Sequence, residues 1–364
     1  MASGTYYEAW MESEGIPIVR GFGVSDLREV ETKPWPRMGG EGAFLQLAGM
    51  EGLTGAYVLK LAPGTSTNRG HHLYQVLYHV VEGSGELEVE PWDGGLVQRR
   101  SFGSGALFAI PLNATYRLRA GEAGARLLAV TDAPMLMDIF HSAEFLFGDS
   151  FAFRDRYDGA ADYFTRSRKY LVPGGMVWET NFIEDAKVAL LDPEERKGTG
   201  VKITHFEMAD NSLGGHLAGW PSGRYHKAHY HAGGAVLHIL QGEGYSLMWP
   251  VEWGMHPYQD GWGDQVVRVD WKPGAVFCPP SKWFHQHFNV GAVEAKQLAL
   301  RWGSKKHPTG FHLHLSGAKS VEGLAGVFMN VKEGGTLIEY EDEDPAIRQI
   351  WEQELAKRGL AAAR

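Results

Sequence analysis

The chain has 364 residues, a net charge of −9 at pH 7, and a composition of 44% hydrophobic and 22% charged residues. Such a composition is typical of a folded globular protein, and the length suggests about two domains. The negative charge and the lack of a Lys/Arg run argue against a nucleic-acid partner. No apolar run is long enough to predict a membrane span, and the N-terminus lacks the pattern of a signal peptide. We therefore expect a cytoplasmic protein that acts on small molecules.

The first half of the chain contains short β-rich runs punctuated by glycine and proline, such as GAYVLKLAPG and LYHVVEGSGELEVEP. One stretch begins at Gly64, contains His72 and ends at Gly83, and a second stretch begins with Gly105 and Pro111. The same framing residues recur at the same spacing in the second half of the chain. An internal repeat of this kind predicts two copies of one β-rich domain.

Helix-like periodicity is confined to two places. One is the region between the copies, around Ala143 to Tyr170, and the other is the C-terminus, where Pro345 can start a helix. The expected C-terminal helix carries an apolar stripe formed by Ile347, Ile350, Trp351 and Leu355.

In the second copy, Gly223 is followed after five residues by His229-Tyr230-His231, and then by Ala235 and Gly242. Residues two apart share one face of a strand, so the imidazoles of His229 and His231 are expected to point at one spot.

A second segment begins at Gly274 and continues through Pro280 and His285 to Asn289. If His285 arrives from another strand, the three imidazoles form a set suited to a divalent transition metal. The single cysteine, Cys278, lies in this segment between apolar neighbours, which predicts a buried, inert thiol and excludes an intrachain disulfide.

Together the two segments resemble the paired motifs of the cupin superfamily, G-x5-H-x-H-x3-E-x6-G and G-x5-P-x-G-x2-H-x3-N. The resemblance implies an all-β fold of two cupin barrels, of the double-stranded β-helix or jelly-roll type, with short flanking helices. In the first copy, Gly70, Tyr116 and Ala120 replace two histidines and the asparagine, so that copy keeps only His72 and cannot assemble a three-histidine site.

We accordingly expect four regions along the chain. They are an N-terminal barrel with an N-terminal arm and a degenerate metal site (1–140), an inter-barrel helical or loop segment (141–200), a metal-binding barrel (201–318) and a C-terminal extension with a helix (319–364).

Two positions depart from the cupin motifs: Ala235 stands in the Glu position and Lys282 in the inner Gly position. Without the carboxylate ligand, three faces of an octahedral ion are open to a chelating substrate and dioxygen. Gentisate 1,2-dioxygenase and its relatives resemble this pattern, including the P-S-x-x-W-H-x-H-x-N segment that begins here at Pro280. Their substrate-binding arginine corresponds to Leu237 in this chain.

Two further residues are candidates for catalytic roles. His287 shares strand parity with His285, so it is expected inside the barrel, either as a general acid/base beside the metal or as a ligand in place of His285. Arg301, on the strand after the second segment, is the best available carboxylate clamp, although parity does not fix which face of the strand it occupies.

The remaining histidines are interpreted as structural. His226 is out of phase with His229, which places it on the outer face of the strand. His79 and His238 occupy matching positions in the two copies and are expected to face outward near the contact between the barrels. No motif surrounds the H-x-H of His312 and His314, so we expect no second metal there.

The resemblance favours a mononuclear Fe(II) dioxygenase that cleaves a hydroxylated aromatic or enolic small molecule with O2. The first alternative is a non-oxidative cupin isomerase, lyase or decarboxylase in which Mn, Ni, Zn or Fe acts as a Lewis acid. The second alternative is a bicupin that only binds a small molecule. By analogy with other cupins, a homo-oligomer formed through barrel edges is expected.

Overall fold

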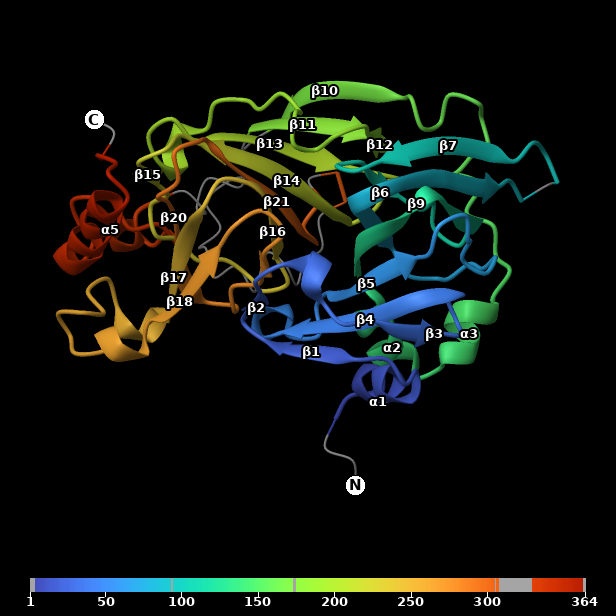
Figure 1. The fold of residues 1–364 in the computed structure, drawn as a ribbon, viewed down its shortest axis with the longest axis horizontal. Helices are drawn as coiled ribbons and strands as arrows, with labels where there is room; N and C mark the ends of the chain where they lie inside the picture. The colour runs from blue at the N-terminus through green and yellow to red at the C-terminus, as the bar shows by residue number, and fades with distance from the viewer. Residues whose placement is uncertain (1–3, 93, 173–174, 305, 308–328, 363–364) are drawn as a thin grey trace.

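The computed structural model describes most of the chain, and every structural statement below concerns the described residues, which are 4–92, 94–172, 175–304, 306–307 and 329–362. The histidine pair His312 and His314 lies outside them. The strands form two β-barrels side by side (Figure 1), so the expected all-β architecture of two barrels is confirmed. None of the described helices is long and apolar enough to span a membrane.

The first barrel is one strongly curved sheet of nine strands. Its strands are β1 (Ile18–Gly21), β3 (Lys33–Trp35), β4 (Gly40–Leu47), β5 (Gly55–Leu61), β6 (Val76–Glu90), β7 (Gln98–Gly103), β8 (Leu107–Ala109), β9 (Thr115–Thr131) and β12 (Phe182–Ile183). The long strands β6 and β9 pair along most of their length, and their register shifts between Val80 and Glu82 and again between Gly83 and Gly85. Such bulges bend both strands, which lets the sheet close on itself.

The second barrel is formed by a sheet of eight strands that faces a sheet of four. The larger sheet contains β2 (Gly23–Val24), β10 (Ser167–Val172), β11 (Gly175–Thr180), β13 (Lys202–Glu207), β14 (Leu213–Trp220), β16 (Val236–Gln241), β19 (Val276–Phe277) and β21 (Ala295–Trp302). The smaller sheet contains β15 (Arg224–Tyr225), β17 (Gly244–Pro250), β18 (Val267–Trp271) and β20 (Trp283–Asn289).

Strand pairing crosses between the two halves of the chain in both directions. The N-terminal strand β2 pairs with β19 of the second barrel, through Val24 opposite Val276. In return, β12 of the inter-barrel segment pairs with β8 of the first barrel, through Phe182 opposite Phe108. The proposed boundaries at residues 140 and 200 are therefore crossed by strand pairing in both directions.

Alternating residues of the central strands divide between the barrel interiors and the contact between the barrels. In β5, Tyr57 faces the core of the first barrel, whereas Val58 joins a shared cluster with Leu298 and Leu300 of β21. Period-two alternation thus lets each sheet bury both of its faces, one inward and one against the other barrel.

The helices differ from expectation between the barrels and agree at the C-terminus. α1 (Tyr6–Ser13) and α2 (Ala133–Phe140) were not predicted, and the expected helical region contains only α3 (Ala143–Gly148) before β10 begins. The rest of this segment is irregular up to β10, and its aromatic residues, such as Tyr157 and Tyr163, enter the first-barrel core from that irregular backbone.

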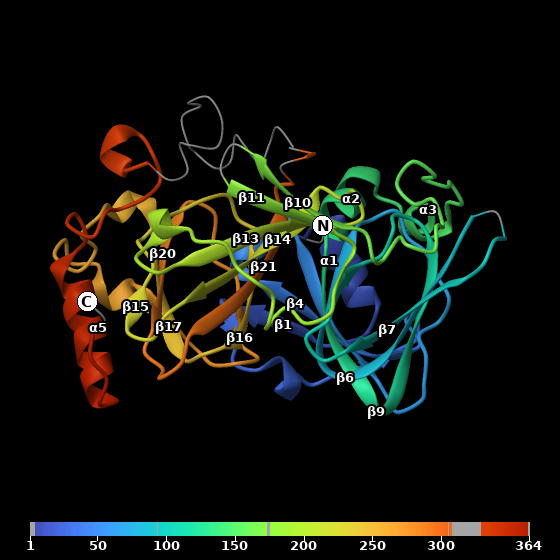
Figure 2. The same cartoon turned by 90° about the horizontal axis from the view of Figure 1, so that it is seen from above.

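The C-terminal helix α5 (Pro345–Lys357) is confirmed. Its residues Ile347, Trp351 and Leu355 are buried against the outer face of the smaller sheet, while Ile350 is partly buried there. Helix α5 lies at the end of the molecule opposite α3 (Figure 2). It therefore closes the side of the second barrel that faces away from the first.

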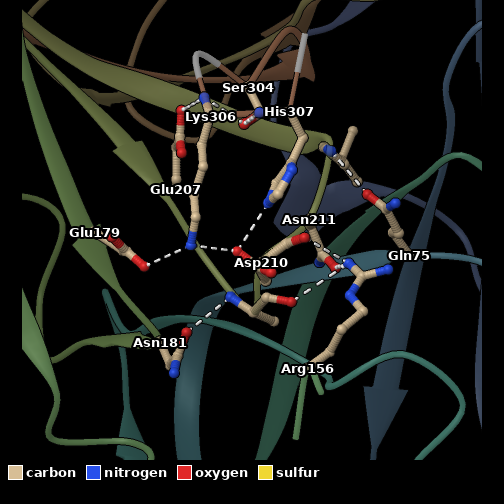
Figure 3. A network of polar contacts seen from close by, with 12 residues as sticks. Gln75, Arg156, Glu179, Asn181, Glu207, Asp210, Asn211, Ser304, Lys306 and His307 are labelled. Carbon is tan, nitrogen blue, oxygen red and sulfur yellow. Dashed lines mark hydrogen bonds and ion pairs between the residues drawn. The ribbon is translucent and has the colours of Figure 1, made fainter. Parts of the chain in front are cut away.

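A polar network fastens the inter-barrel segment to the end of β21 (Figure 3). Arg156 donates from Nη2 to the Asp210 carbonyl and to Asn211 Oδ1, both at 2.7 Å. The Asp210 carboxylate contacts His307 Nε2 at 2.8 Å and Lys306 Nζ at 2.5 Å. Asp210 adopts a left-handed backbone with φ 57°, which this network holds in place.

The matching histidines of the two copies meet between the barrels. The ring centroids of His79 and His238 are 5.0 Å apart, and both side chains are buried, as expected. Burial lowers the pKa of His238 to about 4 and lowers the pKa of His79 well below its ordinary value. Asp26 and Arg28 act on the His238 pKa in opposite directions, the first raising it and the second lowering it.

The lowered pKa values of His79 and His238 predict that the fold loses stability in acid. Because their folded-state pKa is depressed, the unfolded chain binds more protons below pH 6.5, and stability is lost as pH falls toward 4. Each histidine contributes a slope of about 1.4 kcal/mol per pH unit in that window. The double variant His79→Leu/His238→Leu should flatten the dependence of the urea midpoint on pH between 6.5 and 4 relative to wild type. Parallel curves for the two proteins would contradict this.

Candidate metal centre

The three motif histidines come together inside the second barrel. His285 lies on β20, and His229 and His231 lie in the segment between β15 and β16. The backbone of this segment is paired with β20, because His229 N donates to His285 O at 3.2 Å and His285 N donates to His229 O at 2.9 Å. One donor atom from each ring lies within 4.8 Å of the other two.

The rings are oriented by hydrogen bonds to the backbone. The Nδ1 atoms of His229 and His285 lie 3.0 Å from the carbonyl oxygens of Lys227 and Trp283, respectively, and Nδ1 of His231 lies 2.6 Å from that of Ala232. A carbonyl only accepts, so each Nδ1 carries the proton and each Nε2 keeps its lone pair. Carbonyl contacts of this kind fix the tautomer of metal-binding histidines.

The electrostatics of the barrel interior keep these rings neutral. Burial lowers the pKa of His285 to about 3, and it lowers the pKa values of His229 and His231 well below their ordinary range. Neutral imidazole is the form that binds a metal ion. Three such donors suit Fe, Mn, Zn, Ni or Cu, so the residues present fit a divalent transition metal.

The position that usually supplies a fourth ligand offers none. Ala235 and Leu237 face the core of the second barrel together with Ile239 and are buried. A metal held by the three histidines therefore has no protein carboxylate from this position. Leu237 also confirms that no guanidinium reaches the centre from the position where the resembling family has its arginine.

His287 lies in the interior, as its parity with His285 predicts. Its ring centroid is 5.6 Å from that of His285, and its Nδ1 lies 2.8 Å from Ser246 Oγ. Ser246 Oγ also accepts a hydrogen bond from the Trp271 indole at 3.1 Å. The indole proton leaves the hydroxyl free to donate its own proton to His287. His287 is thereby oriented beside the three-histidine cluster and outside it.

His226 faces the interior, so the prediction that it lies on the outer face was wrong. It is buried, its ring centroid lies 4.4 Å from Trp220, and it lies 5.4 Å from the ring of His287. The parity argument fails because β15 ends at Tyr225 and the chain is irregular between that strand and His229. Alternation of side chains holds only along a continuous strand.

Arg301 faces the barrel interior. It shares the face of β21 with Ala295 and Ala299, which belong to the core of the second barrel. Its positive charge lowers the pKa of both His231 and His216. The structure thereby settles which side of the strand this residue occupies.

A second cation beside the histidines was missed by the sequence analysis. Lys197 ends a short helical turn in the segment before β13, and its Nζ lies 3.4 Å from His229 Nε2. Burial, together with the charge of Arg301, lowers the pKa of Lys197 to about 7. No motif surrounds Lys197 in the sequence, so only the folded chain reveals its place.

Lys282, the second residue that departs from the motif, has a strained backbone conformation. Lys282, in the inner Gly position, has φ 56°, and Asn113 has φ 58° at the equivalent position of the first copy. A left-handed residue explains why glycine suits this turn. The strained turn is held because Lys282 N donates to the His231 carbonyl at 3.1 Å.

The first barrel uses the corresponding positions differently. His72 Nδ1 contacts the Tyr74 carbonyl at 2.7 Å, and His72 Nε2 lies 3.3 Å from the Tyr116 hydroxyl. That hydroxyl continues a chain to Tyr78 at 3.0 Å and from there to Tyr57 at 2.6 Å. Tyrosine hydroxyls thus fill the space that the second barrel gives to histidines.

The first barrel also supports the loops of the metal centre. Glu51 Oε1 accepts from Ser281 N at 2.7 Å, and the Gly49 carbonyl accepts from Gly234 N at 2.6 Å. A Cβ at Gly49 would lie 2.4 Å from the Cys278 carbonyl oxygen. The two loops that carry the motif are therefore in close contact with the other barrel. Cys278 itself is buried, as predicted, and burial raises the pKa of its thiol.

A separate surface cavity of about 520 Å³ adjoins the Asp210 network but does not resemble a binding site. Its cations are already held by neighbouring carboxylate, carbonyl or amide oxygens. Arg166 pairs with Asp158 and Asp162, each at 2.8 Å, and Arg168 pairs with Glu179 at 2.6 Å. The interior of the second barrel remains the candidate site.

Comparison with known proteins gives only distant matches among solved structures. No protein-family model and no curated protein matches the chain. Among solved structures, a deletion mutant of oxalate decarboxylase from Bacillus subtilis is 13% identical, with a TM-score of 0.49 over 80% of this chain and 79% of that chain. A structure of the same enzyme described for its Mn(II) centres is 14% identical, with a TM-score of 0.47 over 80% and 79%. Likeness at this level says nothing about the reaction.

The strand order and the histidine cluster define the protein as a double β-barrel with a three-histidine cluster that could hold a metal ion. The histidine cluster of the described chain lies in the second barrel, between its two sheets.

Removal of one histidine should empty this centre. The variant His285→Ala leaves two donors, so metal content measured by inductively coupled plasma mass spectrometry should fall from about one ion per chain to near zero. His72→Ala, which removes the one motif histidine that the first copy keeps, should retain the wild-type content. Equal metal content in wild type and His285→Ala would place the ion elsewhere.

Because the first barrel contacts the loops that carry the histidine motif, a substitution in the first barrel should affect metal binding in the second. In Gly49→Ala, the new methyl group meets the backbone of residues 278 and 279, so the loop must shift. We expect a loss of about 1–3 kcal/mol in stability and weaker metal retention against a chelator. Gly103→Ala is the control, because its Cβ meets nothing within 4 Å. Identical behaviour of the two variants would show that the contact is unimportant.

Proposed function

We propose that this protein is a metal-dependent enzyme that transforms a small chelating substrate inside the second barrel, with the metal acting as a Lewis acid. The observation that supports it is the cluster of His229, His231 and His285, whose neutral imidazoles point at one spot with no carboxylate in the cluster among the described residues. When bound, the metal would polarise a substrate oxygen and stabilise the negative charge that develops there. A decarboxylase, lyase or isomerase reaction uses that chemistry directly.

The residues around the cluster supply orientation and proton handling. His287 is oriented by Ser246 and faces the interior, so it is placed to hold or release a proton at its Nε2. Trp220, Trp271 and Phe277 belong to the barrel core and exclude bulk water from this space. A dry, aromatic-walled interior strengthens every electrostatic interaction with the substrate.

A second candidate is an Fe(II) dioxygenase that cleaves an aromatic or enolic substrate. Ala235 favours it, because the missing ligand leaves room on the metal for a chelating substrate and O2 together. The proposed Lewis-acid chemistry needs no oxidant, so the two candidates separate on one measurement.

The test is turnover with and without oxygen. Protein reconstituted separately with Mn, Fe, Zn and Ni would be incubated with a panel of small carboxylic and enolic acids that chelate divalent metals. Products would be identified by mass spectrometry under air and under argon. We expect the same product and rate under both atmospheres, with loss of at least about 100-fold in rate in His285→Ala. Substrate loss that requires oxygen and consumes it stoichiometrically would support the dioxygenase instead.

A further inference from the structure

We infer that residues 336–343 position the metal ligand His229, so that docking of this segment and binding of a metal ion are coupled. These residues follow the second barrel and precede α5, and we call them the C-terminal strap. The inference depends on the proposed function only in assuming a metal ion at the three histidines. It gives a positioning role to a part of the chain that lies outside both sequence motifs.

The strap pairs with the backbone of the segment that carries His229, on the side opposite β20. Tyr230 N donates to the Thr336 carbonyl at 3.1 Å, and Ile338 N donates to the Ala228 carbonyl at 2.8 Å. These groups alternate along the segment with those of His229, which face β20. Because buried backbone groups need partners, the strap completes the hydrogen bonding of a segment that β20 holds on one side only.

The strap is itself held on both sides. Leu337 lies opposite His229 in an antiparallel bridge, and Leu337 and Thr336 are fully buried. On the other side, Val331 N donates to the Leu337 carbonyl at 2.9 Å, and Leu337 N donates to the Met329 carbonyl at 3.0 Å. The strap is thus an inner layer of the structure with backbone partners to either side of it.

Two side chains of the strap fix the residues that precede His229. Glu339 Oε2 pairs with Lys227 Nζ at 2.5 Å, and both groups are partly buried. The Tyr340 hydroxyl donates to the Tyr225 carbonyl at 2.6 Å, and the Tyr340 ring lies 5.6 Å from Lys227 Nζ. The Lys227 carbonyl is the group that Nδ1 of His229 contacts at 3.0 Å. Contacts that hold Lys227 therefore also hold the direction of the His229 ring.

A third side chain connects the strap to β20. The Glu343 carboxylate is buried and accepts hydrogen bonds from the Tyr225 hydroxyl and from Gln286 Nε2, the latter at 3.1 Å. Gln286 stands between His285 and His287 on β20. Helix α5, which begins directly after the strap, lies beside β15 and β20 in both views (Figures 1 and 2). The strap thus contacts both of the segments that supply metal ligands.

Metal binding and docking of the strap should stabilise each other. A metal ion binds when its three donors converge, and the docked strap restricts the backbone and the ring of His229 to that arrangement. By thermodynamic linkage, if docking of the strap strengthens metal binding, then bound metal strengthens docking by the same factor. A strap that only covered the outer face of the smaller sheet would show no such coupling.

The first experiment weakens the strap without truncating the chain. In the double variant Glu339→Gln/Tyr340→Phe, the ion pair of Glu339 and the hydrogen bond of the Tyr340 hydroxyl are both lost. We expect the dissociation constant for Co(II) or Zn(II), measured by competition with a chelator, to rise about tenfold or more, with altered visible absorption bands of bound Co(II). Glu352→Gln is the matched control, because it removes an exposed ion pair with Arg348 on α5. Equal dissociation constants in the double variant and this control would overturn the inference.

The second experiment needs no substitution and follows amide hydrogen exchange of the wild-type protein by mass spectrometry. On addition of Zn(II), the amides of residues 336–343 should exchange about tenfold more slowly, because opening of the strap must then disturb a bound metal ligand. Strand β7 of the first barrel is the internal control, and its exchange should not change. A strap whose exchange does not respond to Zn(II) at full occupancy would contradict the coupling.

The outcomes separate this inference from the proposed function. If the protein binds Zn(II) at the histidines but the strap neither affects nor responds to binding, the inference is wrong and the proposed function stands. If coupling is observed but no substrate is turned over, the inference stands and the proposed function fails. If His285→Ala binds Co(II) and Zn(II) as tightly as wild type, the ion is not at the histidines and both fail. A double variant that does not fold is recognised by circular dichroism, and the exchange measurement on the wild type then decides.

Discussion

The backbone pairing between His229 and His285 is the interaction on which the candidate site depends. Two hydrogen bonds of 3.2 and 2.9 Å join an otherwise irregular segment to β20. That pairing brings ligands more than fifty residues apart into one cluster, and the carbonyl contacts at each Nδ1 then set the direction of each Nε2. The geometry is therefore fixed mainly by the backbone, which is the most rigid part of a β-barrel.

The interiors of the two barrels contain different groups. The first keeps the turns of the repeat but fills its interior with tyrosine hydroxyls, and it contributes β2, Gly49 and Glu51 to the support of the second. The second holds the histidines and the cations. Because strands pass between the barrels in both directions, neither barrel is an independent unit, and changes in one barrel should affect the other.

Most of the molecule follows the ordinary rules of folding, with paired charges on the surface and alternating apolar residues inside. The interior of the second barrel departs from them, because it places the buried cations Lys197 and Arg301 in the same space as neutral histidines. Such local conflict with stability is typical of functional sites, where a ligand supplies the missing partner. Charge and hydrogen bonding thus point to the same place as the histidine spacing.

The sequence by itself determined the repeat, the two motifs, the inward parity of His285 and His287, and the apolar stripe of α5. These features depend on local turns and on the period of a continuous strand, which residue spacing records directly. Only the tertiary structure decided that His226 and Arg301 face inward, that Lys197 lies beside the histidines, and that an irregular segment connects α3 to β10. Those positions lie in irregular segments or depend on contacts distant in the chain, where long-range packing rather than local periodicity sets the direction of a side chain.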